Sequence, residues 1–181
     1  MQLALIDLKA RGLAPLAGLP HLMSPIASDT ASATSLLERI LEEMDRRDKK
    51  NVSMPRVVIV VDEVIDLLML GGKPVENALT RLAQRGREAG MHLVVGAQKP
   101  SSGVLGSHFK ANLPMRLVGR VGSSDDARVA SGISGSGAEK LSGRGDFLAV
   151  ACGQVTRFQA AYTPARDMNE LVVTARGGRW R

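Results

Sequence analysis

The hydrophobic pattern alternates between short, continuous apolar runs and longer stretches with apolar residues on one helical face. The short runs are QLALIDL at 2–8, VVIVV at 57–61 and HLVVGA at 92–97. Unbroken runs rich in Val, Ile and Leu are typical of strands buried on both faces of a parallel sheet. The chain is therefore expected to alternate strand and helix, which is the pattern of an α/β protein.

Two helices are expected between these strands. The first is predicted to run from Ser28 or Asp29, either of which can cap it, to about Arg47. Gly71-Gly72 breaks the pattern after the second strand, and Pro74 suits the first turn of a further helix that is expected to stop at Gly90. The expected buried residues are Leu36, Leu37, Ile40, Leu41 and Met44 in the first helix, and Val75, Ala78, Leu79, Leu82 and Ala83 in the second.

The second half of the chain is richer in glycine and has shorter apolar runs. A strand is expected over Met115–Val121, and a short helix is expected to begin at Ser123. A glycine-rich segment then leads to two closing strands, Asp146–Cys152 and Gln154–Tyr162. We expect the ligands of such a protein to bind at the carboxyl ends of its strands.

Length and charge restrict the class of protein further. The 181 residues suffice for one core, so we expect one domain over residues 1–164, followed by a short helix and basic tail over 165–181. Aromatic residues make up only 3%, so base stacking is not the obvious route to nucleic-acid binding. The net charge of +6 nevertheless favours a polyanionic partner.

The sequence favours a reducing compartment. Cys152 is the only cysteine, which excludes an internal disulfide, and the three histidines are too scattered for a metal site. No apolar run approaches membrane-spanning length, so no membrane insertion by this chain is expected. Asp7 and Lys9 interrupt any signal-peptide pattern at the N-terminus. The expected location is cytoplasmic.

The most informative chemistry lies where the run 57–61 passes directly into Asp62 and Glu63. Adjacent carboxylates at the end of a buried parallel strand have the form of a Walker B motif. In that motif the first acid holds Mg²⁺ and the second polarises an attacking water. An ordinary buried strand that ends in a solvated acidic turn gives the same string, so the acid pair alone does not decide between the two interpretations.

Longer strings around the acid pair are more specific. They are RVVIVVDEVIDLLML, ALTRLAQRGREAGMHLVVGAQKPS, KANLPMRLVGRV and GAEKLSGRGDFL, with LIDLK and GLPHL near the N-terminus. Together they resemble the motor domain of the FtsK/SpoIIIE family of DNA translocases, from about Leu3 to Tyr162. The resemblance implies a RecA-like P-loop NTPase fold, a three-layer α/β sandwich with a mainly parallel sheet. It also implies ATP and Mg²⁺ as cofactors, double-stranded DNA as partner, and a homo-oligomeric ring, usually a hexamer.

The resemblance assigns roles to four residues around the nucleotide. Asp62 matches the acid that coordinates Mg²⁺, and Glu63 matches the catalytic glutamate. Gln98 matches the polar residue that senses the γ-phosphate and helps to place the attacking water. Arg87 matches an arginine supplied to the nucleotide of a neighbouring subunit, where a guanidinium can stabilise charge on the transferring phosphoryl group. Without the resemblance, Arg87 would be interpreted as a helix-end arginine that interacts with the helix dipole or Glu88.

The resemblance also assigns DNA and nucleotide contacts in the second half of the chain. Lys99, Lys110 and Arg128 match loops that face the central channel of the ring, where they would contact phosphates without reading bases. They are equally well explained as solvated surface cations. The segment Gly132–Gly145 matches a segment near the base of the nucleotide, which makes Gly145 a candidate nucleotide-binding residue; its glycines can also be simple turn residues.

One family motif is missing from the sequence. No GxxxxGK[ST] occurs in these 181 residues, and the glycine-rich segment contains no Gly-Lys-Ser/Thr. The chain therefore resembles about the C-terminal three-quarters of a motor core, with the first strand and P-loop absent. Membrane association is expected only through an N-terminal region of the kind that many members have.

Three interpretations remain open from the sequence. The first is part of an ATP-driven DNA translocase that cannot hydrolyse ATP by itself. The second is a DNA-binding or ring-modulating protein without ATPase activity. A conjugation-type DNA pump of the same superfamily is the third, although such pumps would not share the whole RLAQ-to-AQKP string. The biological process, whether chromosome segregation, sporulation, or plasmid or phage transfer, is not indicated.

Overall fold

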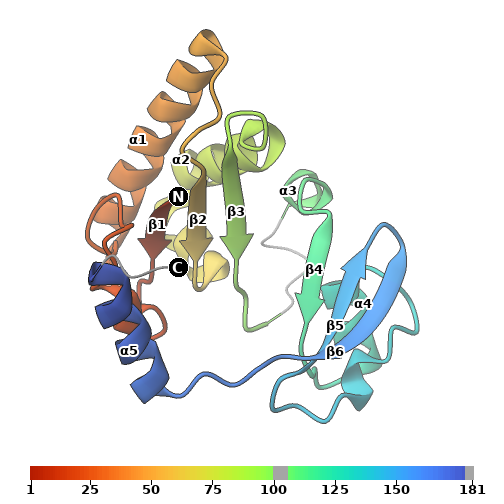
Figure 1. Ribbon diagram of the computed structural model, residues 1–181. Coiled ribbons are helices and arrows are strands. Elements are labelled where there is room, and N and C mark those ends of the chain that lie inside the picture. Colours follow the sequence, from red (N-terminus) through yellow and green to blue (C-terminus); the bar gives the residue numbers. More distant parts are fainter. Residues whose placement is uncertain (100–105, 178–181) are drawn as a thin grey trace. The chain divides into compact units, whose positions relative to one another are not determined.

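The computed structural model describes residues 1–99 and 106–177, apart from the side chains of residues 107 and 108. The chain divides into two compact units (Figure 1). Unit 1 contains residues 1–98 and the segment from Pro164 onward, and unit 2 contains residues 99–163. Each unit has its own three-stranded sheet.

The sheet of unit 1 is parallel. Its strands are β1 (Gln2–Ile6), β2 (Val57–Val61) and β3 (Met91–Val95), in that spatial order. Ile6, Val61 and Val95 lie in register, so the three carboxyl ends form one edge. In Figure 1 the three arrows point the same way. The parallel arrangement predicted from the apolar runs is confirmed.

The helix between β1 and β2 begins where its cap predicts. In α1 (Thr30–Lys50) the Asp29 side chain accepts a hydrogen bond from the backbone N–H of Ser32, whose hydroxyl accepts one from the backbone N–H of Asp29. This reciprocal box satisfies two donors of the first turn. Of the five residues predicted to be buried in this helix, four are buried and Leu41 is half-buried.

The helix between β2 and β3 is longer than predicted and kinked. It runs over α2 (Val64–Arg85), and Gly72 interrupts it with φ 59° and ψ −150°. This backbone conformation is open to glycine and strained for other residues, so Gly72 accounts for the predicted break. The helix ends at Arg85, not at Gly90, and residues 86–90 form a turn before β3. Arg87 therefore lies in this turn and not on the helix.

A buried arginine joins the segments at the amino end of the sheet. Arg47 is 1% exposed; its Nε donates to Glu43 Oε1 at 2.8 Å, and its Nη1 donates to the carbonyl oxygens of Pro55 (2.8 Å) and Ala89 (3.0 Å). It thus ties the end of α1 to the segment that enters β2 and to the turn that enters β3.

The last helix belongs to unit 1. In α5 (Ala165–Arg176), Val172 and Ala175 are buried, and Arg176 donates to the carbonyl oxygen of Gly18 at 2.6 Å, beside η1 (Ala14–Leu16). Within the described ranges, no helix has both the length and the apolar character to cross a bilayer.

Unit 2 is built on an antiparallel sheet. Its strands lie in the order β4 (Met115–Val118), β5 (Asp146–Ala151) and β6 (Gln154–Gln159). The buried cluster of this unit contains Val118 and Leu148 from the strands, and Ala127, Ala138 and Leu141 from segments outside the sheet. Cys152 and Gly153, both with positive φ, form the two-residue turn between β5 and β6. The other elements of unit 2 are α3 (Ser107–Ala111), α4 (Ser124–Ser131) and η2 (Ala138–Lys140).

Candidate nucleotide site at the carboxyl edge of the parallel sheet

The two predicted acids leave the sheet at its carboxyl edge. The Asp62 amide donates to the Ile6 carbonyl at 3.0 Å, and Glu63 is the residue immediately before α2. Gly96 fixes this edge from β3, because its N–H donates to Val61 O and its carbonyl accepts from the Val64 amide. A Cβ on Gly96 would lie 2.3 Å from the Asp62 carbonyl oxygen, so only glycine allows this close approach.

Glu63 has one satisfied and one unsatisfied carboxylate oxygen. Its Oε2 accepts a hydrogen bond from the backbone N–H of Gln98 at 3.0 Å. Its Oε1 is buried and has no hydrogen-bond partner among residues 1–99 and 106–177. A buried polar atom without a partner costs about 1–3 kcal/mol, and such atoms in native proteins call for a functional or strain-related explanation. The structure thus brings Glu63 and Gln98 together through the main chain of Gln98. Their roles at a nucleotide stay predictions.

The loop after β1 forms a wall beside Asp62. A Cβ on Gly12 would lie 2.9 Å from Asp62 Oδ2, so the backbone of this loop lies close to the carboxylate. The loop is organised by Asp7, which is 1% exposed. Its carboxylate accepts hydrogen bonds from three backbone amides, those of Lys9 (3.1 Å), Arg11 (2.9 Å) and Leu13 (2.9 Å).

This loop also brings a cation to the acids. Lys9 Nζ lies 3.0 Å from Asp66 Oδ2, in the first turn of α2. The hydrogen bond to Asp66 raises the pKa of Lys9, and the charges of Asp66, Glu63 and Asp62 act in the same direction against partial desolvation. Sequence reasoning missed this loop, although an aspartate at a strand end followed by Gly12 was a usable signal.

The donor set fits Mg²⁺ held together with a nucleotide. Within the described part of the chain, no group of three or more His, Cys, Asp or Glu residues could hold a metal ion. Mg²⁺ is usually bound by one or two carboxylates, waters and substrate phosphates, and not by an all-protein cage. The half-buried Asp62 and the unpaired Glu63 oxygen match that requirement.

Arg87 lies at the opposite edge of the same sheet. It is exposed in the turn that precedes β3, and no ion pair to it is found within residues 1–99 and 106–177. The two arginines before it on α2 are paired with α1: Arg81 with Asp45 at 3.1 Å, and Arg85 with Asp48. Because β2 and β3 separate the two edges, Arg87 cannot reach Glu63 of its own chain.

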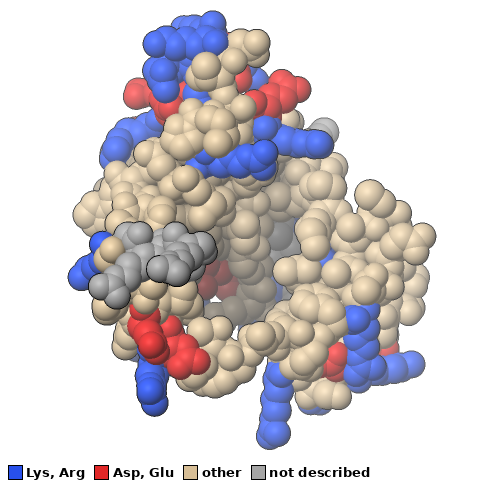
Figure 2. All heavy atoms as spheres, in the orientation of Figure 1, with Lys and Arg blue, Asp and Glu red and all other residues tan. Residues whose placement is uncertain are grey.

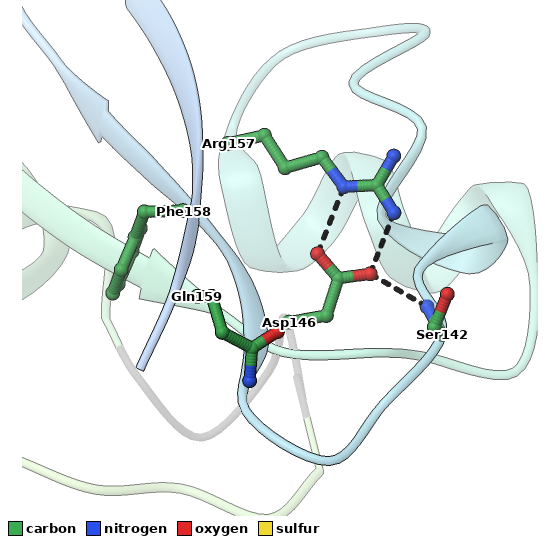
Figure 3. Close-up of a pocket in the computed structure, with 5 residues that line it drawn as sticks. All are labelled: Ser142, Asp146, Arg157, Phe158 and Gln159. Atoms are coloured by element: carbon green, nitrogen blue, oxygen red, sulfur yellow. Dashed lines mark hydrogen bonds and ion pairs between the residues drawn. The ribbon is translucent and has the colours of Figure 1, made fainter. Parts of the chain in front are cut away.

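Gly145 and a pocket beside it in unit 2 have a structural explanation. Gly145 has φ 90°, and a Cβ there would lie 2.8 Å from the Ala160 carbonyl oxygen. Next to it, Asp146 accepts two hydrogen bonds from Arg157 (2.8 and 2.7 Å) and one from the Ser142 amide at 2.7 Å (Figure 3). Arg157 lowers the pKa of Asp146 to about 2. The Asp146 carboxylate thus joins β5 to β6 and to the segment before β5. Nucleotide binding by Gly145 stays a prediction.

The predicted DNA-binding residues all fall in unit 2. Lys99 is exposed at its start, and Lys110 is half-buried on α3. Arg128 is exposed on α4, with its guanidinium 3.8 Å from Asp125. Residues 100–105 of the same predicted loop lie outside the described ranges. Figure 2 shows a denser group of Lys and Arg over the end of α1, where Arg46, Lys49 and Lys50 are exposed.

Sequence comparisons identify the relatives of the chain. The sequence model of the FtsK/SpoIIIE family matches residues 1–54 and 48–102. The DNA translocase FtsK of Sporosarcina ureae is 35% identical over 200 residues, covering 95% of this chain, and that of Staphylococcus epidermidis is 36% identical over the same coverage. The chain spans about a quarter of the length of these relatives.

Comparison with solved structures supports the fold. The pCW3 conjugation coupling protein TcpA, determined with ATPγS, has a TM-score of 0.81 at 20% identity, over 97% of this chain and 56% of its own. The Thermomonospora curvata type VII secretion ATPase EccC has a TM-score of 0.78 at 23% identity, over 97% of this chain and 24% of its own. The fold is that of P-loop ATPase motor domains, and by its sequence the chain belongs to the FtsK/SpoIIIE family.

Proposed function

We propose that this chain is the acid-bearing part of an ATP-driven translocase of double-stranded DNA. The observation that carries the proposal is the Oε1 of Glu63 beside Asp62, at the carboxyl edge of a parallel sheet: it is buried and has no partner in the part of the chain that the structure describes. An acceptor held there without a partner suits a water or ligand that the bound nucleotide brings with it. Membership of the FtsK/SpoIIIE family supports DNA as the substrate.

Each residue has a separate task in this proposal. Asp62 would hold Mg²⁺, which shields the charge of the nucleotide phosphates when it is bound. Glu63 Oε1 would orient and polarise the attacking water. The hydrogen bond from the Gln98 amide to Oε2 fixes the Glu63 carboxylate and leaves the exposed Gln98 side chain to contact the γ-phosphate. Gly145 would lie near the base.

Arg87 would act on the nucleotide of a neighbouring copy in a ring, for which a hexamer is the family precedent. Two features support this: its position at the edge opposite Glu63, and the absence of an ion pair to it among the described residues. A free guanidinium at a subunit edge is suited to stabilise charge on a phosphoryl group supplied from outside.

A second candidate function follows from one observation, the absence of GxxxxGK[ST] from these 181 residues. Without that loop, these residues lack the P-loop backbone cradle and the P-loop lysine for the β- and γ-phosphates. The 181 residues alone would then bind DNA, or modulate a ring, without hydrolysing ATP. Lys99, Lys110 and Arg128 would contact DNA phosphates in either case.

ATP hydrolysis with and without an added P-loop separates these functions. The purified chain with duplex DNA is expected to show no turnover, and a fusion behind the P-loop segment of a FtsK relative is expected to hydrolyse ATP. In the fusion, Glu63→Gln should abolish turnover. Arg87→Ala should abolish ATP turnover in rings made only of that variant. Rings that mix Arg87→Ala subunits with Glu63→Gln subunits should regain ATP turnover. A fusion that binds nucleotide and stays inactive would contradict the translocase proposal. ATP turnover by the 181 residues alone would contradict the expectation that they do not hydrolyse ATP.

DNA contact is tested by the salt dependence of binding. Each phosphate contact contributes about 0.9 to the slope of log K against log salt. Changing Lys99, Lys110 and Arg128 together to Ala should reduce the magnitude of this negative slope by about 2.7 if all three contact phosphates. Lys73→Ala, at a residue whose side chain is 82% exposed and paired with Glu76, is the matched control. An unchanged slope in the triple variant would remove these residues from the DNA interface.

A further inference from the structure

We propose that Lys9 is a built-in counter-ion of the acidic site, which makes the site favour Mg²⁺ that arrives with a nucleotide over free Mg²⁺. The inference rests on the proposed function, because it takes Asp62 as the residue that holds the metal. It assigns a task to the loop after β1, for which neither the sequence patterns nor the Walker B interpretation provides one.

The position of Lys9 is fixed at its backbone. The buried carboxylate of Asp7 accepts hydrogen bonds from the amides of Lys9, Arg11 and Leu13, so this short loop has one preferred course. The same course brings Gly12 against the Asp62 carboxylate. Lys9 therefore leaves the backbone from a segment that is part of the wall of the acid site.

Its ammonium faces carboxylates from two parts of the chain. Asp66 in the first turn of α2 is its direct partner at 3.0 Å, and Glu63 and Asp62 at the end of β2 are close enough to affect its protonation. The two side chains of the direct pair are 47% and 41% exposed. An ion pair this exposed contributes little to stability, so the pair is poorly explained as a support for the fold. The same exposure lets Lys9 exchange Asp66 for another anion.

The effect on cation binding has opposite signs for the two forms of Mg²⁺. A free divalent cation at Asp62 is repelled by the nearby ammonium, which weakens its binding. A metal–nucleotide complex brings phosphate oxygens to the same place, and these attract the ammonium. Lys9 thereby keeps the empty site electrostatically compensated and penalises the cation that comes alone.

Free Mn²⁺, followed by electron paramagnetic resonance at low ionic strength, is the probe. In the full chain without nucleotide, Lys9→Met should raise the Mn²⁺ affinity roughly tenfold, as expected for removing one charge within several ångströms of a divalent ion. Lys9→Arg keeps the charge and should retain the wild-type affinity. Lys73→Met removes the same charge from the 2.8 Å pair with Glu76, farther along α2, and should leave the affinity unchanged.

Asp62→Asn shows whether the bound Mn²⁺ occupies the proposed metal site. If Mn²⁺ binds and Asp62→Asn abolishes its binding, the metal site stands, and the comparison of Lys9→Met with wild type then tests Lys9 alone. Equal affinities in those two proteins would overturn the inference and leave the proposed function intact. An equal gain in Lys73→Met would reduce the effect to overall charge and also overturn it. Absence of any Asp62-dependent Mn²⁺ binding in both the wild type and Lys9→Met would also overturn the inference, because removing the ammonium would then not open the site to a free cation; the proposed function, in which the metal arrives with the nucleotide, would stand.

Discussion

The two edges of the parallel sheet in unit 1 differ in how they use their buried polar atoms. At the amino edge, the guanidinium of Arg47 is buried and donates to Glu43 and to two backbone carbonyls. At the carboxyl edge, Glu63 keeps a buried oxygen that has no partner among the described residues, and the Lys9–Asp66 pair borders solvent. The first edge is closed by its own contacts, and the second is open to a ligand.

The difference shows how a structural charge can be told from a functional one. A buried charge is tolerable when all its hydrogen bonds are made, and then it holds segments together. Asp146 in unit 2 follows the pattern of the amino edge, because Arg157 and the Ser142 amide satisfy its carboxylate even though it lines a pocket. Glu63 departs from this pattern, and it is the residue that we propose as the catalytic glutamate.

Arg47→Met should produce the largest effect, a loss of about 3–5 kcal/mol in the free energy of unfolding. The substitution leaves the Pro55 and Ala89 carbonyls without a donor inside the protein. Urea unfolding followed by circular dichroism measures the loss. Arg46→Met is the control, because Arg46 binds the same Glu43 but is half-exposed, and it should cost less than about 1 kcal/mol. Equal, small losses would show that the amino edge is not closed as described.

Asp7→Ala should be next, at about 2 kcal/mol, because three backbone amides lose their common acceptor. The readout specific to the loop is faster hydrogen exchange of the amides of Lys9, Arg11 and Leu13. Asp29→Ala, which removes an exposed helix cap, should cost about 1 kcal/mol and leave that exchange unchanged. Protected loop amides in Asp7→Ala would mean that Asp7 does not organise this wall of the site.

The amino edge should also be sensitive to acid. Hydrogen bonds from Arg46 and Arg47 lower the pKa of Glu43 from 4.5 to about 2. A lowered pKa stabilises the folded state above the unfolded value, so this contribution is complete above about pH 4.5 and is lost as the pH falls toward 2. Unfolding experiments between pH 5 and 2 should give a flatter pH dependence for Glu43→Gln than for wild type. Parallel curves would show that Glu43 is not coupled to folding.

The sequence predicts unit 1 well because its signals are local. The apolar run 57–61 is β2 as predicted, and Asp29 caps α1. The end of α2 was misplaced by several residues, because the helix ends at Arg85 with Gly86 as its C-cap, and Gly90, which has φ 71°, closes the turn that follows. The acids were predicted from their place after a buried strand, which the parallel register then brings beside Gln98.

What could not be predicted depends on contacts distant in sequence. The three bonds that Asp7 accepts and the approach of Gly12 to Asp62 need the parallel pairing of β1 with β2 before they exist. The partners of Arg47 likewise include Ala89, 42 residues away. In unit 2 the strands were predicted, but their antiparallel pairing in a sheet of their own comes from tertiary contacts that hydrophobic runs do not encode.

Glu63→Gln should have the smallest effect on stability, within about 0.5 kcal/mol of wild type. The oxygen that is replaced can be the unpaired Oε1, while the other still accepts from the Gln98 amide, so no hydrogen bond of the folded chain need be lost. Urea unfolding at pH 7 measures this, with Glu43→Gln as the contrasting variant, because Glu43 loses its charge-assisted bonds to Arg46 and Arg47. In the P-loop fusion, the same Glu63→Gln change should abolish turnover. If Glu63→Gln instead destabilises the chain as much as Glu43→Gln, Glu63 supports the fold, and the distinction between a closed and an open edge fails.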